Sequence, residues 1–429
     1  MSSDHFSLRC LIEAEWQSNE FGDQWNSLVA SSKELTIFST WDWAVAWWNQ
    51  YGQIYRSHVL AVYDKVGKLI GIAPLYFVSK RTLGVFPYRE VHFIGDHSVG
   101  SEYLGFITAP GVESDVVESV MRYLACSRET QQLYQFSGLR GDSVADSTLI
   151  NLVESFGGRL TRNVETCSNI ALPTNYEEFL NTLSKNFRWN ILYQTRRIRK
   201  DLEMRVIITE HEEQIDSHLE RLFDLHTSRW AKRKMPGSFL SENKRAFYRD
   251  VSHRFLKRGW LLFFHLELDG VIRACNYGFR YAGRFYELQT GYDVEFEQQY
   301  KGLGVVLKAH AIKHCIEEGL TTYDFLGGSE DFKKRWGTKT EITTTVKCYP
   351  SGGWAWLTYM GTDGIVKLKQ YLKKVTVGET WDFEVFRWRI LWSIRQRLTK
   401  QPRKIHDDKK PAERATGNSE ITPEEDSRA

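Results

Sequence analysis

The first periodic segment of the chain is an aromatic stripe within residues 41–51. Trp43, Trp47 and Tyr51 recur there at intervals of four residues. That spacing puts the three rings on one face of a helix, because an α-helix turns once every 3.6 residues. A Ser-Thr pair directly before the segment supplies an N-cap side chain. The pattern predicts a helix over 41–51 with a buried aromatic face.

After this helix the pattern changes to that of strands. His58–Tyr63, Leu69–Ser79 and Glu90–Ile94 are rich in β-branched and apolar residues, and a glycine turn separates the first two. Short runs of this kind, bounded by turn residues, are typical of hairpin strands. We predict three antiparallel strands.

The same order of elements returns later in the chain. A helical pattern over Lys244–Lys257 precedes Leu261–Leu268, Val271–Arg280 and Arg284–Tyr292, with glycine turns between the three strands. We interpret the repeat as a duplicated α/β unit. Two unrelated meanders with glycine turns would give the same pattern, and this alternative stays open.

The segment Phe285–Gly319 combines a strand, a glycine loop and a helix. The loop Gln299–Gly304 precedes an apolar helical pattern that ends near Gly319, and a strand follows at Thr322–Leu326. A helix N-terminus carries unpaired N–H groups and partial positive charge, so it attracts anions such as a pyrophosphate. The segment lacks the Gly-Lys-Ser/Thr of a P-loop and the third glycine of a dinucleotide fold. A simple tight turn is the alternative interpretation.

Composition narrows the class of protein. The 429 residues exceed the usual size of one domain, and 42% of them, including 15 Trp, are hydrophobic, so we expect two folded domains. A net charge of only +3 indicates no global attraction to nucleic acid. The six cysteines form no CxxC pair. Because neither a secretory signal nor a long apolar span is evident, we expect a cytoplasmic protein, at most peripheral to the inner membrane.

Two basic segments lie outside these patterns. A helical stretch over Tyr176–Leu202 carries many Arg and Lys residues, which favours a solvated face or, alternatively, a phosphate contact. Residues 365–400 mix basic and aromatic positions as basic amphipathic helices do, and they would dock on the fold or on an anionic surface. Residues 401–429 are polar, and we predict a disordered tail.

The Gln-x-x-Gly-x-Gly of the loop resembles the acetyl-CoA motif of the GNAT acetyltransferase superfamily. Further landmarks resemble the CelD-type acetyltransferases of bacterial cellulose and exopolysaccharide biosynthesis, and together they span roughly residues 37–340. They are Phe38-Ser39-Thr40-Trp41, Gly71-Ile72-Ala73-Pro74-Leu75, Gly291-Tyr292-Asp293, Tyr323-Asp324-Phe325-Leu326-Gly327-Gly328 and Phe332-Lys333-Lys334-Arg335-Trp336.

The resemblance implies an α+β fold with two GNAT-like domains, built from mixed, mostly antiparallel sheets flanked by helices. Fem-type peptidyltransferases share this double arrangement, in which usually only the second half holds the coenzyme. We expect residues 1–170 to form the acceptor side and 171–355 the acetyl-CoA domain. Residues 356–400 would form the helical extension and 401–429 the tail.

The resemblance also implies which residues hold acetyl-CoA. Backbone groups of the strand, at Leu288, Thr290 and Tyr292, would hold the pantetheine arm. The loop would hold the pyrophosphate, through Gln299, Lys301, Gly302, Leu303 and Gly304.

Strand alternation sorts the candidates for catalysis. It puts Glu287, Gln289 and Asp293 on one face, and Tyr286, Leu288 and Tyr292 on the other. If the apolar set faces the core helix, the carboxylates face the cleft, so Glu287 is the first candidate for general base and Asp293 the second. For each, a structural carboxylate is the alternative.

Three further residues complete the predicted catalytic set. Tyr323, or Tyr292, would return a proton to the leaving thiolate. Asp324 is either catalytic or part of a buried structural hydrogen bond. The family-like match suggests that Lys333 orients an acceptor or a phosphate. We expect no metal, because His310 and His314 share a helix face without a carboxylate motif.

The leading hypothesis is an acetyl-CoA-dependent N- or O-acyltransferase of exopolysaccharide, cellulose or envelope biosynthesis. Its acceptor would be a small molecule or a saccharide, without a nucleic-acid partner, and residues 365–400 would contact a membrane or a polysaccharide synthase. A Fem-like transferase that uses aminoacyl-tRNA and a non-catalytic accessory protein of a synthase are the alternatives. The sequence does not identify the acceptor.

Overall fold

The structure is a computed structural model of the chain. It describes residues 6–32, 34–82, 86–96, 99–126, 132–141, 143–155, 158–232, 237–328 and 331–349. They all lie within one compact unit that spans Met1–Thr376. The predicted extension at 356–400 and the predicted tail at 401–429 lie outside the described residues, and both stay predictions.

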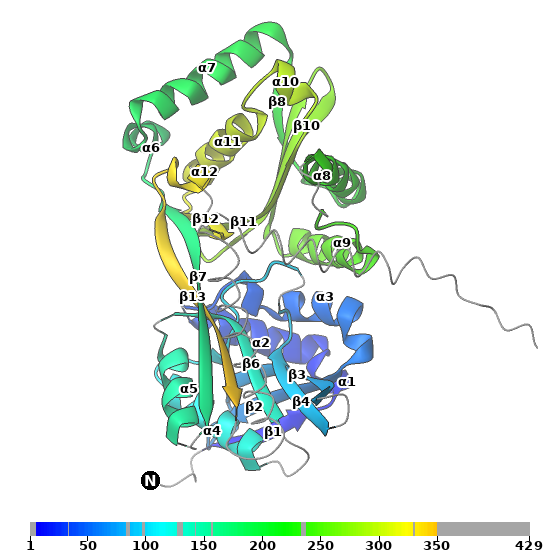
Figure 1. The fold of residues 1–429 in the computed structure, drawn as a ribbon, viewed down its shortest axis with the longest axis vertical. Coiled ribbons are helices and arrows are strands. Elements are labelled where there is room, and N and C mark those ends of the chain that lie inside the picture. Colours follow the sequence, from blue (N-terminus) through cyan, green and yellow to red (C-terminus); the bar gives the residue numbers. More distant parts are fainter. Residues whose placement is uncertain are drawn as a thin grey trace, which may run out of the picture. The chain divides into compact units, whose positions relative to one another are not determined.

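The strands form one mixed, mostly antiparallel sheet (Figure 1). Only β4–β6 and β11–β12 pair in parallel among the described strands. In order across the sheet the strands are β1 (Ser7–Leu11), β2 (Arg56–Tyr63), β3 (Leu69–Thr82), β4 (Phe86–Phe93), β6 (Gln132–Arg140), β13 (Lys339–Tyr349), β7 (Arg159–Ala171), β12 (Thr322–Gly327), β11 (Arg284–Tyr292), β10 (Val271–Tyr281), β9 (Leu261–Leu268) and β8 (Met204–Ile208), and the short β5 (Ile107–Thr108) pairs with β3.

The repeated order of elements is confirmed. Helix α3 (Trp41–Tyr51) precedes the antiparallel strands β2, β3 and β4, and α9 (Glu242–Lys257) precedes the antiparallel strands β9, β10 and β11. Each set then continues into a parallel partner, β6 or β12. Whether the two halves arose by duplication stays a hypothesis.

Strands β7 and β13 join the two halves. β13 pairs with β6 of the first half on one side and with β7 on the other. β7 pairs with β13 over Arg159–Asn169 and with β12 over Cys167–Ala171. The sheet is therefore continuous, and the boundary predicted at residue 170 falls inside β7 (Figure 1).

The remaining helices flank this sheet. They are α1 (Glu13–Trp16), α2 (Asn19–Ser31), α4 (Glu113–Cys126), α5 (Val144–Ser155), α6 (Tyr176–Thr182), α7 (Lys185–Asp201), α8 (Glu212–Lys232), α10 (Phe296–Gln299), α11 (Leu303–Glu317) and α12 (Asp331–Lys334), with 3₁₀ turns η1 (Ile37–Ser39) and η2 (Gly52–Ile54). No helix of the described ranges is both long enough and apolar enough to cross a membrane.

The single basic helix predicted over 176–202 is wrong in one respect, because it consists of two helices. The chain leaves the helical conformation at Leu183. The hydroxyl oxygen of Ser184 then accepts a hydrogen bond from the Phe187 N–H at 3.3 Å, which starts α7 with a new N-cap.

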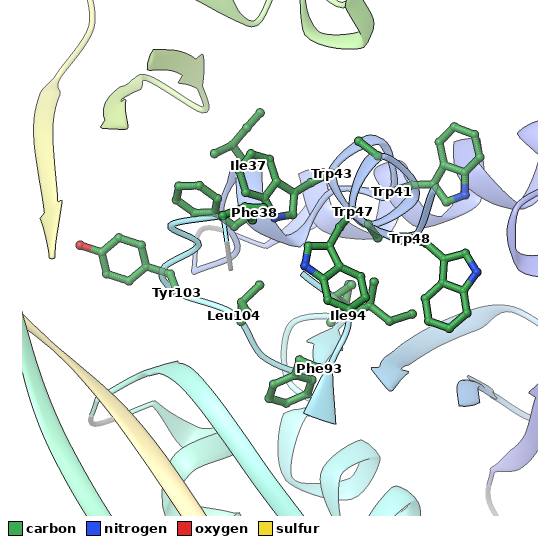
Figure 2. Packing of buried hydrophobic residues seen from close by; sticks show 14 of the residues in the cluster. Ile37, Phe38, Trp41, Trp43, Trp47, Trp48, Phe93, Ile94, Tyr103 and Leu104 are labelled. Carbon is green, nitrogen blue, oxygen red and sulfur yellow. The ribbon is translucent and has the colours of Figure 1, made fainter. Parts of the chain in front are cut away.

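The aromatic helix α3 lies in the main core, as predicted, and is buried on almost every face. Trp43 is fully buried, with ring centroids 4.9 Å from Phe38 of η1 and 4.9 Å from Phe247 of α9 (Figure 2). Trp41 and Trp48 are buried as well, because α2 and α9 also pack against α3. This packing ties the helix of the first half to the corresponding helix of the second.

Candidate active site

The parallel strands β11 and β12 pair only at their beginnings. Their register runs from Arg284 opposite Thr322 to Tyr286 opposite Asp324, whereas β11 continues to Tyr292 and β12 to Gly327. Beyond the last pair, the edge of β11 that faces β12 has no ladder partner in that strand. We call the segments beyond this pair, 287–292 and 325–327, the fork.

A β-bulge shapes the β11 arm of the fork. Tyr277 pairs with Gln289 and Gly278 pairs with Glu287, so Leu288 is an extra residue in β11. Glycine is required at position 278, because a Cβ there would overlap the carbonyl oxygen of Tyr286.

The bulge makes the predicted strand alternation wrong beyond Glu287. An extra residue exchanges the two faces of the strand after it. Glu287 contacts Lys308 of α11 on one face, whereas Gln289 hydrogen-bonds Tyr248 of α9 on the other. Tyr292 is correspondingly on the α11 side, where it lies beside Gly304.

The glycine loop ends at the N-terminus of α11, as the sequence predicted. Gly302 is its N-cap, with φ of 87° in the left-handed region that favours glycine. The Glu297 carboxylate accepts hydrogen bonds from the N–H groups of Gly302 at 2.8 Å and Leu303 at 3.0 Å. Burial raises the pKa of Glu297, and these two N–H groups oppose the rise.

The Glu297 carboxylate stands where an external anion would bind. Its two oxygens have the charge and the hydrogen-bonding capacity of phosphate oxygens, and they take up donors that a helix N-terminus leaves unpaired. The loop is therefore shaped to hold an anion, and a pyrophosphate would compete with this carboxylate.

The other residues predicted for the coenzyme lie around the fork and the loop. Arg229 of α8 donates to the carbonyl and hydroxyl oxygens of Thr290, both at 3.4 Å, and its guanidinium lies 5.1 Å from the Tyr292 ring centroid. Gln299 and Lys301 are exposed, whereas the Leu303 side chain is buried in the core. The set predicted from sequence is thus brought together at one end of α11.

Helix α7 covers the same loop. Arg197 donates to the carbonyl oxygen of Gln299 at 3.1 Å, and its guanidinium lies 5.4 Å from the ring centroid of Tyr300. A Cβ at Gly302 would lie 3.2 Å from Cγ of Gln194. The basic helix therefore contributes one cation, Arg197, beside the loop. A phosphate contact from this helix, the alternative named above, stays a prediction.

Glu287 lies in a buried polar cluster on the α11 side of the sheet. Lys308 donates to its Oε1, and Tyr323 donates to its Oε2 at 2.5 Å. Asn276 donates to Oε2 at 3.2 Å and to the Tyr323 hydroxyl at 2.8 Å. Burial lowers the pKa of Lys308, and the Glu287 charge opposes this. Glu287 thus has the position of a structural carboxylate, the alternative named for it above, and its predicted role as general base stays untested.

Asp293 also has structural partners. It accepts from Arg273 at 2.8 Å and from the N–H groups of Glu295 and Phe296 at 3.1 and 3.0 Å, at the start of α10. Burial alone would raise the pKa of Asp293, but these hydrogen bonds and the Arg273 charge lower it overall. A carboxylate of lowered pKa is a weaker base.

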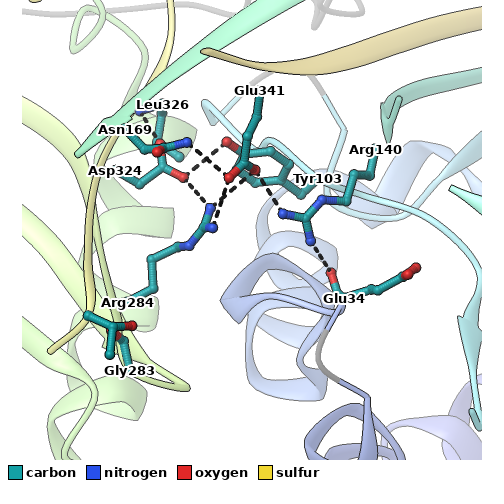
Figure 3. Close-up of polar contacts among 10 residues, drawn as sticks. Glu34, Tyr103, Arg140, Asn169, Gly283, Arg284, Asp324, Leu326 and Glu341 are labelled. Atoms are coloured by element: carbon teal, nitrogen blue, oxygen red, sulfur yellow. Dashed lines mark hydrogen bonds and ion pairs between the residues drawn. The ribbon is translucent and has the colours of Figure 1, made fainter. Parts of the chain in front are cut away.

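Asp324 belongs to a buried network between strands of both halves (Figure 3). It accepts from the Tyr103 hydroxyl at 3.0 Å, from Arg284 at 2.9 Å and from the Leu326 N–H at 2.8 Å. Arg284 also bonds Glu341 of β13 at 3.0 Å. Tyr103 and Leu326 have φ of 55° and 58°, which are strained values for these residue types and occur often near functional sites.

Lys333 holds the end of β12. Its ammonium group donates to four successive carbonyl oxygens, those of residues 325–328, at 2.6 to 3.3 Å. These contacts fix the backbone of the β12 arm of the fork. The predicted role of Lys333 in orienting an acceptor or a phosphate stays a prediction.

A loop of the first half, residues 99–104, reaches the fork. Ser101 accepts a hydrogen bond from the indole N–H of Trp43 at 3.0 Å, which ties the loop to the aromatic core. Glu102 lies against Gly327, and its carboxylate accepts from the Thr343 hydroxyl at 3.5 Å. Sequence reasoning placed the acceptor side nearby in the first half but missed Glu102 and Tyr103, because no local motif marks them.

Residues 185–334 match the family described as acetyltransferase (GNAT) domain. This matched segment contains the fork, the glycine loop and α11. The GNAT part of the predicted resemblance is thereby confirmed, whereas the CelD-like subtype is not. No curated protein matches the sequence significantly.

Several solved structures are similar to this chain. The crystal structure of FemX superposes with a TM-score of 0.55 at 13% identity, over 79% of this chain and 96% of that chain. A tandem GNAT protein from the clavulanic acid biosynthesis pathway gives 0.44 at 11% identity, over 81% and 99%. The C-terminal domain of a putative lysylphosphatidylglycerol synthetase from Agrobacterium fabrum gives 0.45 at 11%, over 80% and 95%. Because only FemX among these three has a TM-score above 0.5, we rely on its structure alone, as support for the fold and nothing further.

Proposed function

We propose that this chain is an acetyl-CoA-dependent N- or O-acyltransferase. The observation that carries the proposal is the fork, which opens beside the glycine N-cap of a 15-residue helix inside the segment that matches a GNAT domain. Beyond Tyr286 the β11 edge has no ladder partner in β12, which would leave room for an amide-rich arm beside it, and the helix would offer N–H groups to a pyrophosphate.

Different residues would hold the pantetheine arm and the pyrophosphate of the coenzyme. Backbone groups of Leu288, Thr290 and Tyr292 would hold the pantetheine arm, and the loop from Gln299 to Gly304 would hold the pyrophosphate after Glu297 leaves it. The Glu297 carboxylate supports this use, because it occupies the same donors that phosphate oxygens would require. When bound, acetyl-CoA supplies an activated acetyl thioester.

The side chains of the second half would prepare the site around the thioester. Tyr323, whose hydroxyl donates to Glu287, would supply a proton to a leaving thiolate. Burial, followed by the neighbouring Glu287 charge, raises the pKa of Tyr323 well above its usual value, so the hydroxyl is protonated at neutral pH but is a weaker acid than an exposed tyrosine. Lys333 and Asp324 would position the β12 arm through the contacts described above.

The substrate class rests on the resemblance to CelD-type acetyltransferases. We propose a saccharide or a small envelope precursor as acceptor, in bacterial exopolysaccharide, cellulose or envelope biosynthesis. Contact of residues 365–400 with a membrane or a polysaccharide synthase is part of the same proposal.

Isothermal titration of the full chain with acetyl-CoA tests the proposal. The wild type should bind, and Gly302→Glu should abolish binding, because a side chain and a second carboxylate would enter the loop. Gly319→Glu is the matched control, since Gly319 also has a positive φ, of 74°, but lies at the other end of α11 in open space. Absence of heat with the wild type, or equal binding by Gly302→Glu, would contradict the proposal.

A Fem-like transferase that uses aminoacyl-tRNA is the second candidate. Glu297 already fills the loop, and α7 presents an exposed aromatic pair beside its basic residues. Trp189 and Tyr193 stack with ring centroids 4.8 Å apart and are 62% and 44% exposed, which suits stacking on unpaired bases. A salt-sensitive gel shift with tRNA, together with no acetyl-CoA binding, would favour this candidate.

A further inference from the structure

We propose that Glu102, supplied by the first half of the chain, is the general base that removes the proton from the acceptor. This inference rests on the proposed acyltransferase function and adds a catalytic residue to it. It starts from the position of one loop across the fork.

The loop 99–104 touches both arms of the fork where they part. A Cβ at Gly100 would lie 3.3 Å from Cδ1 of Leu288, the bulge residue of β11. On the other arm, the Tyr103 hydroxyl donates to Asp324 of β12 at 3.0 Å. Glu102 lies between these two contact residues in the sequence, and its carboxylate lies against Gly327, the last residue of the β12 arm. In this proposal the acceptor lies beside this carboxylate.

Gly327 makes room for this carboxylate. A Cβ at that position would overlap Oε1 of Glu102. The side chain therefore lies directly against the backbone of the β12 arm, which Lys333 holds in place through the carbonyl oxygens of residues 325–328. Glu102 as a whole residue is half-buried.

Four carboxylates around the fork have cationic partners. Lys308 pairs with Glu287, Arg273 with Asp293, and Arg284 with both Asp324 and Glu341. Within the described ranges, no lysine or arginine forms an ion pair with Glu102, whose hydrogen-bonding partners are the Cys167 thiol and the Thr343 hydroxyl. A carboxylate without a cation keeps more of its basicity.

The negative charges near Glu102 raise its pKa. The pKa of Glu102 is raised to about 7, mainly by burial and then by the charges of Glu165 of β7 and Asp324 of β12, although the hydrogen bonds with Cys167 and Thr343 lower it. The nearby Glu341 is neutralised by Arg284 and Arg140. A base of this strength is close to the optimum for proton transfer at neutral pH.

The step is a proton transfer coupled to acyl transfer. The acceptor N–H or O–H gives its proton to the Glu102 carboxylate, and the freed electron pair forms the new bond to the acetyl carbon. The C–S bond breaks, its electron pair leaves with sulfur, and the sulfur takes up a proton. Glu102 then releases its proton to solvent, so no oxidant or further reactant is needed.

The first test is a carboxyl titration without ligand. In the full chain labelled with ¹³C at Glu side-chain carboxyls, we expect one resonance to titrate near pH 7. Glu102→Gln should remove it, and Glu165→Gln should move it to lower pH, because a negative neighbour is lost. If no Glu carboxyl titrates above about pH 6, the proposal is overturned.

The second test separates the base from the binding site. In acetyl-CoA hydrolysis, where water stands in for the acceptor, Glu102→Gln should lower kcat by roughly 10²- to 10⁴-fold. Its dissociation constant for acetyl-CoA should stay within about threefold of the wild type, a change below 1 kcal/mol. Glu165→Gln should remain active, with the acid limb of its pH profile shifted to lower pH.

The outcomes show separately whether Glu102 is the general base and whether the chain is an acyltransferase. Unchanged kcat in Glu102→Gln, with normal acetyl-CoA binding, overturns the role of Glu102 and leaves the acyltransferase intact. No acetyl-CoA binding by the wild type overturns both. If Glu102→Gln does not fold, Glu102→Asp should fold and retain partial activity, since it keeps a carboxylate. An inactive, folded Glu102→Asp with no group titrating near pH 7 in the wild type would overturn the proposal.

Discussion

At the N-terminus of α11, one carboxylate occupies N–H groups that a bound anion would use. Glu297 bonds two of the N–H groups that a pyrophosphate would need. Hydrogen bonds to a charged group contribute about 1.5–3 kcal/mol, against about 0.5–1.5 for neutral pairs. A ligand must replace these bonds, so the side chain acts as an internal competitor.

We therefore predict that Glu297→Gln binds acetyl-CoA more tightly than the wild type. If the lost carboxylate competed with the ligand by about 1 kcal/mol, the dissociation constant for acetyl-CoA should fall roughly fivefold. Isothermal titration of both proteins measures this constant. Glu295→Gln is the control, because Glu295 is exposed and only two residues away. Weaker or equal binding by Glu297→Gln would show that the carboxylate does not occupy the coenzyme site.

The loop itself was predictable from sequence, but its occupant was not. Gln299–Gly304 combines glycines with a following apolar helix, and this local pattern is visible in the residues alone. Glu297 enters the loop because the short helix α10 turns the chain back on itself. That fold-back is set by the Asp293 cap and its Arg273 partner rather than by a pattern around Glu297.

At the scale of elements, the three meander strands of the second half were predicted closely, whereas β8 and α8 were not predicted. β9 and β11 have the predicted bounds, because turns at Gly270 and Gly283 punctuate them. The faces of β11 were predicted wrongly, since the bulge at Leu288 depends on Gly278 of the neighbouring strand. Alternation within one strand contains no information about that neighbour.

The orientation of Glu287, which precedes the bulge, has a measurable consequence of its own. Because Glu287 faces α11, it forms a buried ion pair with Lys308. Removing one partner of such a pair leaves an uncompensated charge and costs about 3–5 kcal/mol. We predict that Lys308→Met lowers the free energy of unfolding in urea by this amount.

A second variant isolates the charge. Glu287→Gln combined with Lys308→Met should be more stable than Lys308→Met alone, because no buried charge is then unpaired. Lys313→Met, on an exposed position of the same helix, should leave the unfolding midpoint unchanged. If Lys308→Met is as stable as the wild type, the ion pair is not buried in solution.

At the scale of the whole described unit, long-range pairing joins the two halves. β13 comes from the end of the described chain and lies between β6 and β7. Such pairing between distant segments leaves no local pattern, so the continuous sheet could not be predicted from sequence. For the same reason the network of Arg284 with Glu341 and Asp324 was missed.

Arg284 should therefore matter for the stability of both halves. Arg284→Ala leaves Asp324 and Glu341 without their shared cation, and we predict a loss of about 3–5 kcal/mol in the free energy of unfolding. Urea unfolding followed by tryptophan fluorescence measures it. Arg122→Ala, whose pair with Glu118 is exposed, should have no resolvable effect. Equal stability of the two variants would contradict the role assigned to the network.

Hydrogen exchange of the full chain, with and without saturating acetyl-CoA, shows whether the coenzyme binds at the fork. The fork and the helix N-terminus form one binding site in this account, so the coenzyme should slow exchange at the backbone amides of 288–292 and 301–304 together. The amides of β2 and β3 in the first half should exchange unchanged. No protection in either segment, or protection confined to other elements, would contradict a coenzyme site at the fork.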